Sequence, residues 1–168
     1  NSNTAVGMNA LSAEVAGDRN VAVGYGSLTA QTNASTVDTY NIAVGYNAGA
    51  GVTTGIQNTL IGGLAGDAIT TASYNTAVGT GSLAANTTGD NNTAVGVNAL
   101  QVNTTGAGNV AMGANALDSN TTASYNTAVG HASLSANTTG AGNVAFGAEA
   151  LFTNILGRNS TAIGREAL

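Results

Sequence analysis

Cysteine, proline, tryptophan and lysine are absent from the 168 residues of this chain. Without cysteine, the chain can form neither a disulfide framework nor a thiolate metal site. Only 7% of the residues are charged, and three arginines against a net charge of −5 leave no basic patch, so we expect no nucleic-acid binding. No apolar run approaches the roughly 20 residues that a transmembrane helix needs, so we expect no membrane span.

Residue types that carry catalysis are also scarce. His131 is the only histidine, and the eight acidic residues do not pair in the sequence. General acid–base catalysis needs partners that these residues lack, so we expect the chain not to be an enzyme. No glycine is followed by lysine, which excludes a phosphate-binding loop. A calcium-binding nonapeptide needs a repeating aspartate, and only Gly89–Asn92 comes close to it, so we expect no metal and no cofactor.

One repeated unit of 17 residues fills the chain, and Asn75–Asn91, NTAVGTGSLAANTTGDN, is a representative copy. We number its places 1 to 17 from the first asparagine. Place 1 is Asn in all copies but the last, place 3 is Ala in all but one, and place 5 is always Gly. Successive copies lie 17 residues apart, except for one step of 21 between Asn20 and Asn41. This self-similarity predicts a single repeat domain over residues 1–168.

Each unit predicts one short strand followed by turns. Place 2 is Thr, Val or Ile and place 4 is always apolar, so these two side chains share one face of a strand and the alanine of place 3 has the other. Gly at place 5 ends the strand, the Ala/Ser-Leu pair at places 8 and 9 forms a second short strand or a corner, and Asn-Thr-Thr-Gly closes the turn. Weak helical patterns at residues 10–16 and 149–156 are disfavoured by the glycines and threonine pairs. We therefore predict an all-β fold, a parallel β-solenoid (β-roll) of about ten 17-residue coils, with an asparagine ladder at place 1.

The bulky side chains of places 4 and 9 are predicted to fill the coil. This proposed core comprises Val6, Leu11, Val23, Leu28, Val44, Ile61, Val78, Leu83, Val95, Leu100, Met112, Leu117, Val129, Leu134, Phe146, Leu151 and Ile163. Because such a core is thin, several chains are expected to wrap around one axis with the place-3 alanines turned inward. This proposed inter-chain face comprises Ala5, Ala22, Ala43, Ala77, Ala94, Ala111, Ala128, Ala145 and Ala162.

The irregular copies and the two ends of the repeat add three further expectations. The four extra residues fall within 31–40 and are predicted to form an outward loop, since insertions in solenoids bulge from one face. In the third and fourth units Gly49 and Gly66 replace Leu at place 9, while Val52 and Ile69 replace Asn at place 12, which indicates compensation inside the coil. Both ends consist of regular units, so we expect both ends to be uncapped.

Tyrosines and threonines are the residues of the predicted corners and turns that could contact a partner. The tyrosines are predicted at corners, where they either pack the corner or stack on sugars and anchor a partner. They are Tyr25, Tyr40, Tyr46, Tyr74 and Tyr125. Threonine pairs at places 13 and 14 would stack either as a hydroxyl ladder in a turn or as an ice-binding array. They are Thr53-Thr54, Thr70-Thr71, Thr87-Thr88, Thr104-Thr105, Thr121-Thr122 and Thr138-Thr139.

The stretch NTAVGTGSLAANTTGDNNTAVGVNAL (residues 75–100) resembles the repeats of phage tail fibre-like proteins. The x-A-V-G core is similar to the head repeat of trimeric autotransporter adhesins, and the likeness covers essentially the whole chain. For the adhesin heads, this resemblance implies a left-handed parallel β-roll with three chains around one axis.

We therefore expect a homotrimeric structural rod of a phage tail fibre (a virion part) or of a surface adhesin, located outside the cell or at its surface. Such a rod holds or forms a surface that binds a glycan or protein receptor on a cell. The alternatives are a self-assembling extracellular filament stacked end to end and an ice-binding β-solenoid.

Overall fold

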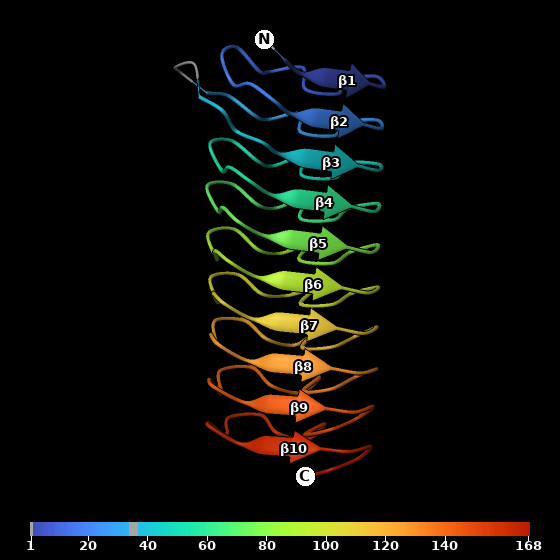
Figure 1. Ribbon diagram of the computed structural model, residues 1–168, viewed down its shortest axis with the longest axis vertical. Coiled ribbons are helices and arrows are strands. Elements are labelled where there is room, and N and C mark those ends of the chain that lie inside the picture. The colour runs from blue at the N-terminus through green and yellow to red at the C-terminus, as the bar shows by residue number, and fades with distance from the viewer. Residues whose placement is uncertain (1, 34–36) are drawn as a thin grey trace.

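The computed structural model describes residues 2–33 and 37–168, which form a parallel β-solenoid of about nine turns (Figure 1). Ten strands of three residues each stack in sequence order into one sheet, and no helix occurs in the described ranges. The all-β solenoid predicted from the 17-residue period is confirmed. The strands are β1 (Thr4–Val6), β2 (Val21–Val23), β3 (Ile42–Val44), β4 (Thr59–Ile61), β5 (Thr76–Val78), β6 (Thr93–Val95), β7 (Val110–Met112), β8 (Thr127–Val129), β9 (Val144–Phe146) and β10 (Thr161–Ile163).

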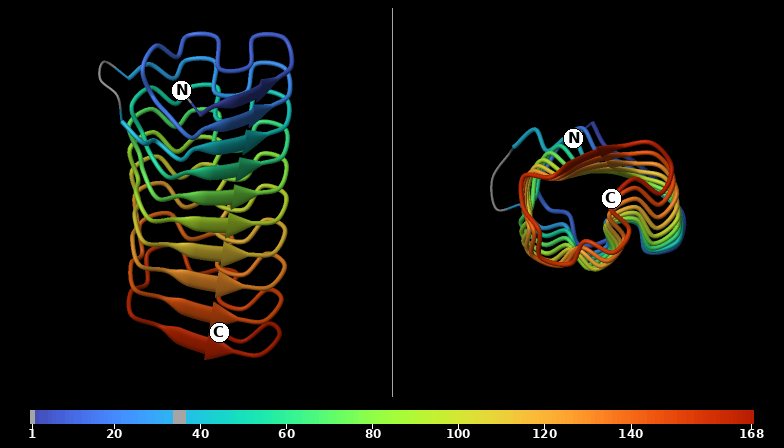
Figure 2. Two further views of the ribbon diagram at one scale, coloured as in Figure 1. Left: turned by 45° about the horizontal axis from the view of Figure 1, so that its top comes forward. Right: turned by 90° about the horizontal axis from the view of Figure 1, so that it is seen from below.

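Each strand pairs in parallel with the next, and equivalent places lie opposite one another. In β5 and β6, for example, Ala77 pairs with Ala94 and Val78 with Val95. The laps therefore lie in register along the whole rod, as both views in Figure 2 show. We number the coils 1 to 10 by the strand that each contains. Nine steps of about 4.8 Å make a rod about 43 Å long.

The interior is filled from the alanine side of the strand. Ala77, Ala94 and Ala128 are fully buried within the single chain, and so are Leu83 and Leu100 at place 9. Of the predicted core, the place-9 leucines are buried except for Leu11, which is half-buried in the first coil. Alanine and serine at place 8 complete the lining.

The assignment of place 4 to the core is wrong, and so is the assignment of place 3 to an inter-chain face. All ten place-4 side chains point out of the coil and are half-buried or exposed, with Phe146 57% and Ile163 74% accessible. They are Val6, Val23, Val44, Ile61, Val78, Val95, Met112, Val129, Phe146 and Ile163. Eight place-3 alanines are buried inside their own coil: Ala22, Ala43, Ala77, Ala94, Ala111, Ala128, Ala145 and Ala162. Ala5, in the first coil, is exposed.

The narrow width of the coil explains why place 3 points inward and place 4 outward. The leucine of place 9 reaches across a narrow interior, so only a methyl group fits opposite it on the strand. Leu60 supports this explanation, because it is the one residue at place 3 that is not alanine. Its larger side chain packs where Gly49 and Gly66, which replace leucine at place 9, leave room. A Cβ on Gly49 would lie 2.7 Å from Leu60 Cδ1, and one on Gly66 would lie 2.8 Å from Leu60 Cδ2. Val52 and Ile69 are also fully buried, so the predicted compensation inside these two coils is confirmed.

Corners are made by residues with positive φ. Of the two possibilities for places 8 and 9, the structure shows a corner: Leu100 has φ 52°, and so do its equivalents within a few degrees. Places 7 and 17 turn in the same way, for example at Asn98 (φ 57°) and Asn91 (φ 59°). Gly96 at place 5 has φ +136°, and a Cβ there would lie 2.6 Å from the carbonyl of Gly113 in the next coil. Glycine is required at place 5 by both its conformation and this close approach.

Two buried asparagine ladders connect the coils. At place 1, the Asn109 backbone N–H donates to Asn92 Oδ1 at 3.0 Å, and Asn109 Nδ2 donates to the Ala123 carbonyl at 2.9 Å. Asn126 N–H then donates to Asn109 Oδ1 at 3.0 Å, which continues the predicted ladder. A second ladder at place 12, which the sequence did not predict, runs from Asn86 to Asn137 and is likewise buried. These amides bond one another and the backbone inside the coil, except that Asn137 Oδ1, at the end of the second ladder, has no hydrogen-bond partner among the described residues.

The insertion is described only in part. The tip of the predicted outward loop falls on residues 34–36, which lie outside the described residues. On either side of it, Gln31 and Thr39 are fully buried and donate or accept hydrogen bonds within the coil. The flanks of the insertion therefore belong to the body of the rod.

Candidate interaction surface

The outer strand face is a uniform surface that recurs in every coil. We define it as places 2 and 4 of the ten strands, which carry only Thr, Val, Ile, Met and Phe. No charged residue occurs anywhere in places 1 to 5 of any coil. Figure 1 shows the ten strands stacked directly above one another along the rod. The face is therefore an uncharged, largely apolar stripe that runs from the first coil to the last.

Two columns of side chains border this stripe. The place-6 column follows the strands: Met8, Tyr25, Tyr46, Gly63, Thr80, Val97, Ala114, His131, Ala148 and Arg165. The place-17 column precedes the strands: Ser2, Arg19, Tyr40, Gln57, Tyr74, Asn91, Gly108, Tyr125, Gly142 and Asn159. All five tyrosines lie in these columns and are at least 44% accessible. The tyrosines are thus outward corner residues.

One tyrosine pair forms in the place-6 column near the N-terminal end. The rings of Tyr25 and Tyr46 stack with centroids 5.6 Å apart and planes inclined by 13°. Stacked phenol rings present a rigid apolar body with a polar tip. This pair stands at the levels of β2 and β3, directly beside the outer strand face.

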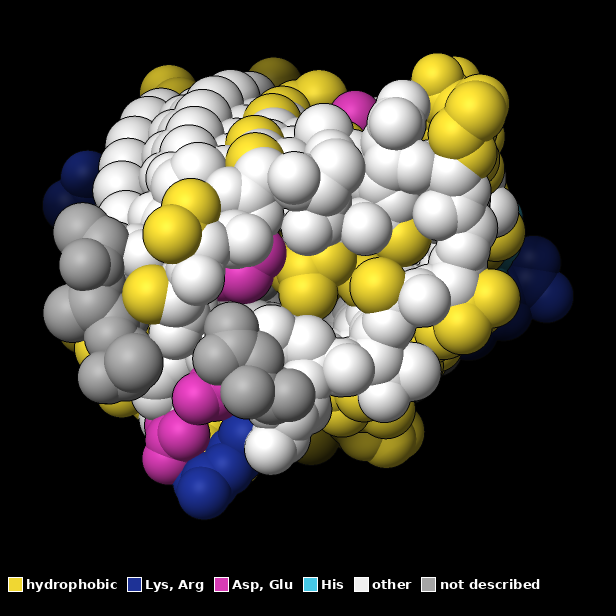
Figure 3. Space-filling model, turned by 90° about the horizontal axis from the view of Figure 1, so that it is seen from above, with side chains coloured by type: hydrophobic (Ala, Val, Ile, Leu, Met, Phe, Trp, Pro, Cys, Tyr) yellow, Lys and Arg dark blue, Asp and Glu magenta, His cyan; other side chains and the backbone are white. Residues whose placement is uncertain are grey.

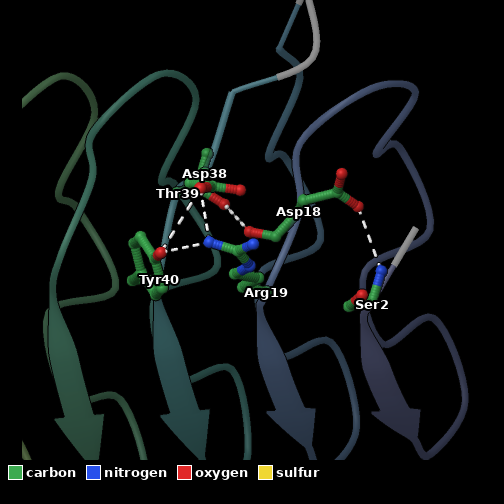
Figure 4. Close-up of polar contacts among 6 residues, drawn as sticks. All are labelled: Ser2, Asp18, Arg19, Asp38, Thr39 and Tyr40. Carbon is green, nitrogen blue, oxygen red and sulfur yellow. Dashed lines mark hydrogen bonds and ion pairs between the residues drawn. The ribbon is translucent and has the colours of Figure 1, made fainter.

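The place-17 column carries a polar cluster at the same two levels (Figure 4). The guanidinium of Arg19 lies over the Tyr40 ring, 5.4 Å from its centroid, and donates to the Tyr40 hydroxyl. It also forms an ion pair with Asp38 at 2.5 Å. Thr39, which lies between Asp38 and Tyr40 in sequence, donates from its backbone N–H to the Asp18 carbonyl at 3.0 Å and so ties the cluster to the neighbouring coil.

Large exposed hydrophobic side chains gather on this part of the surface. Fifteen of the 22 in the described residues belong to the outer strand face, the two columns or Leu64 beside them. A second, smaller group lies in the turns of coil 9, where Phe152, Ile155 and Leu156 are 45% to 65% accessible. Figure 3, which looks onto the N-terminal end, shows hydrophobic side chains around the sides and only a few charged ones.

The threonine pairs lie in turns on another side of the coil. The place-13 hydroxyls donate to backbone carbonyls of the next coil, as Thr87 Oγ1 does to the Thr104 carbonyl at 3.1 Å. Place 14, represented by Thr88, is exposed. In each of the six coils that have a threonine pair, one of the two hydroxyls is therefore used within the rod, which leaves a single exposed threonine column.

Glu14 occupies place 12 of the first coil, where several later coils carry asparagine. Its Oε1 accepts hydrogen bonds from the backbone N–H groups of Ala16 at 2.9 Å and Gly17 at 2.6 Å. Its Oε2 accepts from Gln31 Nε2 at 2.8 Å and Asn33 Nδ2 at 3.1 Å. Burial raises the pKa of this carboxyl, but the hydrogen bonds outweigh burial and lower the pKa below its ordinary value. These hydrogen bonds therefore favour the ionised form of the Glu14 carboxyl.

Asp67 has the opposite environment. Burial raises the pKa of its carboxyl, and hydrogen bonds from the backbone N–H groups of Asp67 and Ala68 offset this only in part. His131 is exposed in the place-6 column. Within residues 2–33 and 37–168, no group of three or more His, Cys, Asp or Glu side chains is arranged to hold a metal ion, and no pocket is present.

Comparison with models of known protein families, with curated proteins and with solved structures found no match. Nothing helical in the described part of the chain has the length and apolar character of a membrane span. The functional argument therefore depends on the surface itself.

Two features of this surface escaped the sequence reasoning. The first is the outward direction of place 4, which Leu60 signals, because the single large residue at place 3 coincides with glycine at place 9. The second is that places 6 and 17 form two continuous columns beside the strand face; the signal is that asparagine or glycine occurs in several copies at places 7 and 17. Residues that tolerate positive φ recur there because the chain turns outward at these places.

Proposed function

We propose that this chain is the structural rod of an extracellular fibre, the shaft or head of a phage tail fibre or of a surface adhesin. Three copies pack around one axis through their outer strand faces. The observation that carries this proposal is the uncharged apolar stripe on the outside of ten stacked strands. Soluble monomers rarely expose a contiguous apolar patch larger than a few hundred Å², and larger patches mark interaction sites.

The dimensions of the stripe support association between copies. The outer strand face together with its two columns spans six residues, from place 17 to place 6, which is at most about 20 Å. Over a rod about 43 Å long, the face and its columns together cover at most about 850 Å². A standard protein–protein interface buries about 800 Å² per partner, so the face and its columns together are large enough for a stable contact. The outer strand face itself carries no charge, and the two arginines of the columns, Arg19 and Arg165, are paired with Asp38 and Glu166, so copies pack without burying an unpaired ion.

The mechanical role follows from how the coils are joined. Every strand is bonded to its neighbours, and two buried asparagine ladders run through the interior. Opening one coil breaks these bonds on both of its sides, so a rod of this kind resists local unfolding and bending. A rigid rod carries a receptor-binding surface away from the particle or cell that bears it. In this proposal the coil is left-handed, and corner side chains outside the inter-chain contact bind a glycan or a protein receptor.

The first experiment measures the mass of the chain in solution by light scattering. We expect three times the chain mass of 16.2 kDa, independent of concentration over the measured range. A mass that grows steadily with concentration would favour the end-to-end filament. A monomer at high concentration would refute the proposal.

A matched pair of variants locates the contact. Val95→Asp puts a charge in the middle of the outer strand face, whereas Thr88→Asp puts the same charge on an exposed turn. Because an unpaired buried carboxylate is strongly unfavourable, we expect Val95→Asp to dissociate the assembly and Thr88→Asp to leave it intact. Circular dichroism should show the β-solenoid in both variants, since neither side chain points into the coil. Equal effects of the two changes would exclude the outer strand face as the contact.

A further inference from the structure

We propose that neighbouring copies lie parallel and level, with the place-6 column of one copy against the place-17 column of the next. This inference depends on the association proposed above and adds the direction, the register and the residues of the contact. It rests on the sizes of the side chains that the two columns present at each level of the rod.

The geometry of the fold defines which edges meet. In a ring of parallel rods whose outer strand faces turn toward a common axis, all strands run in the same sense around that axis. The end of each strand in one copy therefore points at the start of the equivalent strand in the next copy. Antiparallel rods would instead bring each column against itself, with the first level of one copy opposite the tenth of the other.

Large side chains coincide at the levels of β2 and β3. On one edge stands the stacked pair of Tyr25 and Tyr46. On the other edge stands Arg19 with Tyr40, with the guanidinium held over the ring and tied to Asp38. A guanidinium and phenol rings attract one another through the negative faces of the rings. The parallel arrangement thus sets two electron-rich rings of one copy against a cation and a ring of the next.

Sizes also agree near the other end. At the level of β8, His131 occupies the place-6 column and Tyr125, 74% accessible, occupies the place-17 column. At the levels of β7 and β9, both columns carry the smallest residues. These are Ala114 with Gly108 and Ala148 with Gly142. Small residues on both edges allow backbones to approach, so the aromatic contact at β8 lies between two close approaches.

The antiparallel arrangement fits less well. It matches level β3 with level β8, where it pairs aromatic residues. At level β2, however, it sets Tyr25 against Ala148 and Arg19 against Gly142. The four largest side chains of the N-terminal levels then have only two partners of comparable size. The parallel, level arrangement is the one that gives partners to all four.

Engineered disulfides test the register directly, because the chain has no cysteine of its own. Tyr40→Cys with Tyr46→Cys places thiols on both edges at level β3, and Tyr125→Cys with His131→Cys does so at level β8. Within one chain each pair is about 20 Å apart, far beyond the roughly 7 Å that a disulfide spans between Cα atoms. We expect both double variants to form covalent trimers on oxidation, seen on non-reducing gels.

Two further double variants serve as controls. Tyr40→Cys with His131→Cys places thiols on opposite edges five levels apart and should not cross-link. Tyr46→Cys with His131→Cys cross-links only in an antiparallel arrangement. Absence of cross-linking in both level pairs, while the unmodified chain keeps three times the chain mass, overturns the register and leaves the rod proposal standing. Cross-linking of Tyr46→Cys with His131→Cys overturns the register and also the packing of three copies around one axis, because antiparallel copies cannot close a ring of three. A monomeric unmodified chain would overturn both. The level β3 and level β8 variants are independent, so misfolding of one leaves the other to decide.

Discussion

Leu60 offers the sharpest test of how the interior is packed. Its side chain is fully buried and reaches the spaces above Gly49 and Gly66, where side chains would otherwise meet it. Leu60→Ala removes three carbon atoms from this site and leaves a cavity. We expect the free energy of unfolding to fall by about 2–5 kcal/mol, which is the usual range for Leu→Ala in a tight core.

The opposite change fills the same space from another place in the coil. In Gly66→Leu with Ile69→Asn, coil 4 regains the residues that most other coils have at places 9 and 12. Position 66 has φ +57°, so a leucine there costs about 1–2 kcal/mol. Its Cβ would lie 2.8 Å from Leu60 Cδ2, and such overpacking costs about 1–3 kcal/mol more. The asparagine at 69 would join the ladder that begins at Asn86.

Combining both changes should restore part of the lost stability. The new leucine enters the cavity that Leu60→Ala leaves, so the combined variant should be at least about 2 kcal/mol more stable than the sum of the two effects predicts. Guanidinium unfolding followed by far-UV circular dichroism, at one protein concentration, measures each value, since association shifts apparent stability. Leu117→Ala, three coils away, should instead add to Gly66→Leu/Ile69→Asn within about 0.5 kcal/mol. If the effects of Leu60→Ala and of Leu117→Ala were both additive with those of Gly66→Leu/Ile69→Asn, the idea that residues 60 and 66 fill the same space would be refuted.

Four further predictions concern single residues, each tested by the same unfolding assay. Gly96→Ala should cost at least about 2 kcal/mol through strain and a clash, whereas Gly63→Ala, with no atom within 4 Å of the new Cβ, should stay within about 0.5 kcal/mol. Asn109→Ala should cost about 1–3 kcal/mol because it orphans a buried N–H; an unchanged midpoint would contradict the ladder. The pKa of Glu14 is lowered, so its stabilisation exists above the ordinary value of 4.5 and disappears as pH falls through the folded pKa; the deficit of Glu14→Gln should shrink with acid. The pKa of Asp67 is raised, so Asp67→Asn should stabilise at neutral pH; this gain should shrink as pH falls through the raised pKa and vanish below the ordinary value of 3.8.

The sequence predicted the solenoid because a 17-residue period with a fixed x-A-V-G run leaves few other arrangements. It also predicted the place-1 ladder, since asparagine recurs where stacked amides can bond one another. It did not predict which strand face points inward, because alternation defines two faces and not their direction. Size was the wrong guide: valine is larger than alanine, yet the interior has room only for alanine once leucine enters from place 9.

The corner leucines show why local propensity fails here. Leucine in the left-handed region is unfavourable by about 1–2 kcal/mol, so no single-residue preference would place Leu100 at φ 52°. Burial of a leucine side chain contributes about 1.5–3 kcal/mol, which offsets that strain when the side chain fills the coil. The signal in the sequence is the exchange of leucine for glycine at Gly49 and Gly66, because glycine adopts the same φ without strain.

The direction of the strand faces also explains where the repeat varies. Place 3 faces the closed interior and is alanine in nine of ten copies, whereas place 4 and the two columns face outward and change from coil to coil. A perfectly uniform outer face would let two copies slide past each other by one coil and lose only one level of contact out of ten. Register between repetitive surfaces must therefore be set by what is not repeated. The tyrosines, Arg19 and His131 occur in some coils and not in others, and they stand at the edges where neighbouring copies would meet. In a rod built from one unit, the irregular side chains are the ones that can distinguish one level from the next.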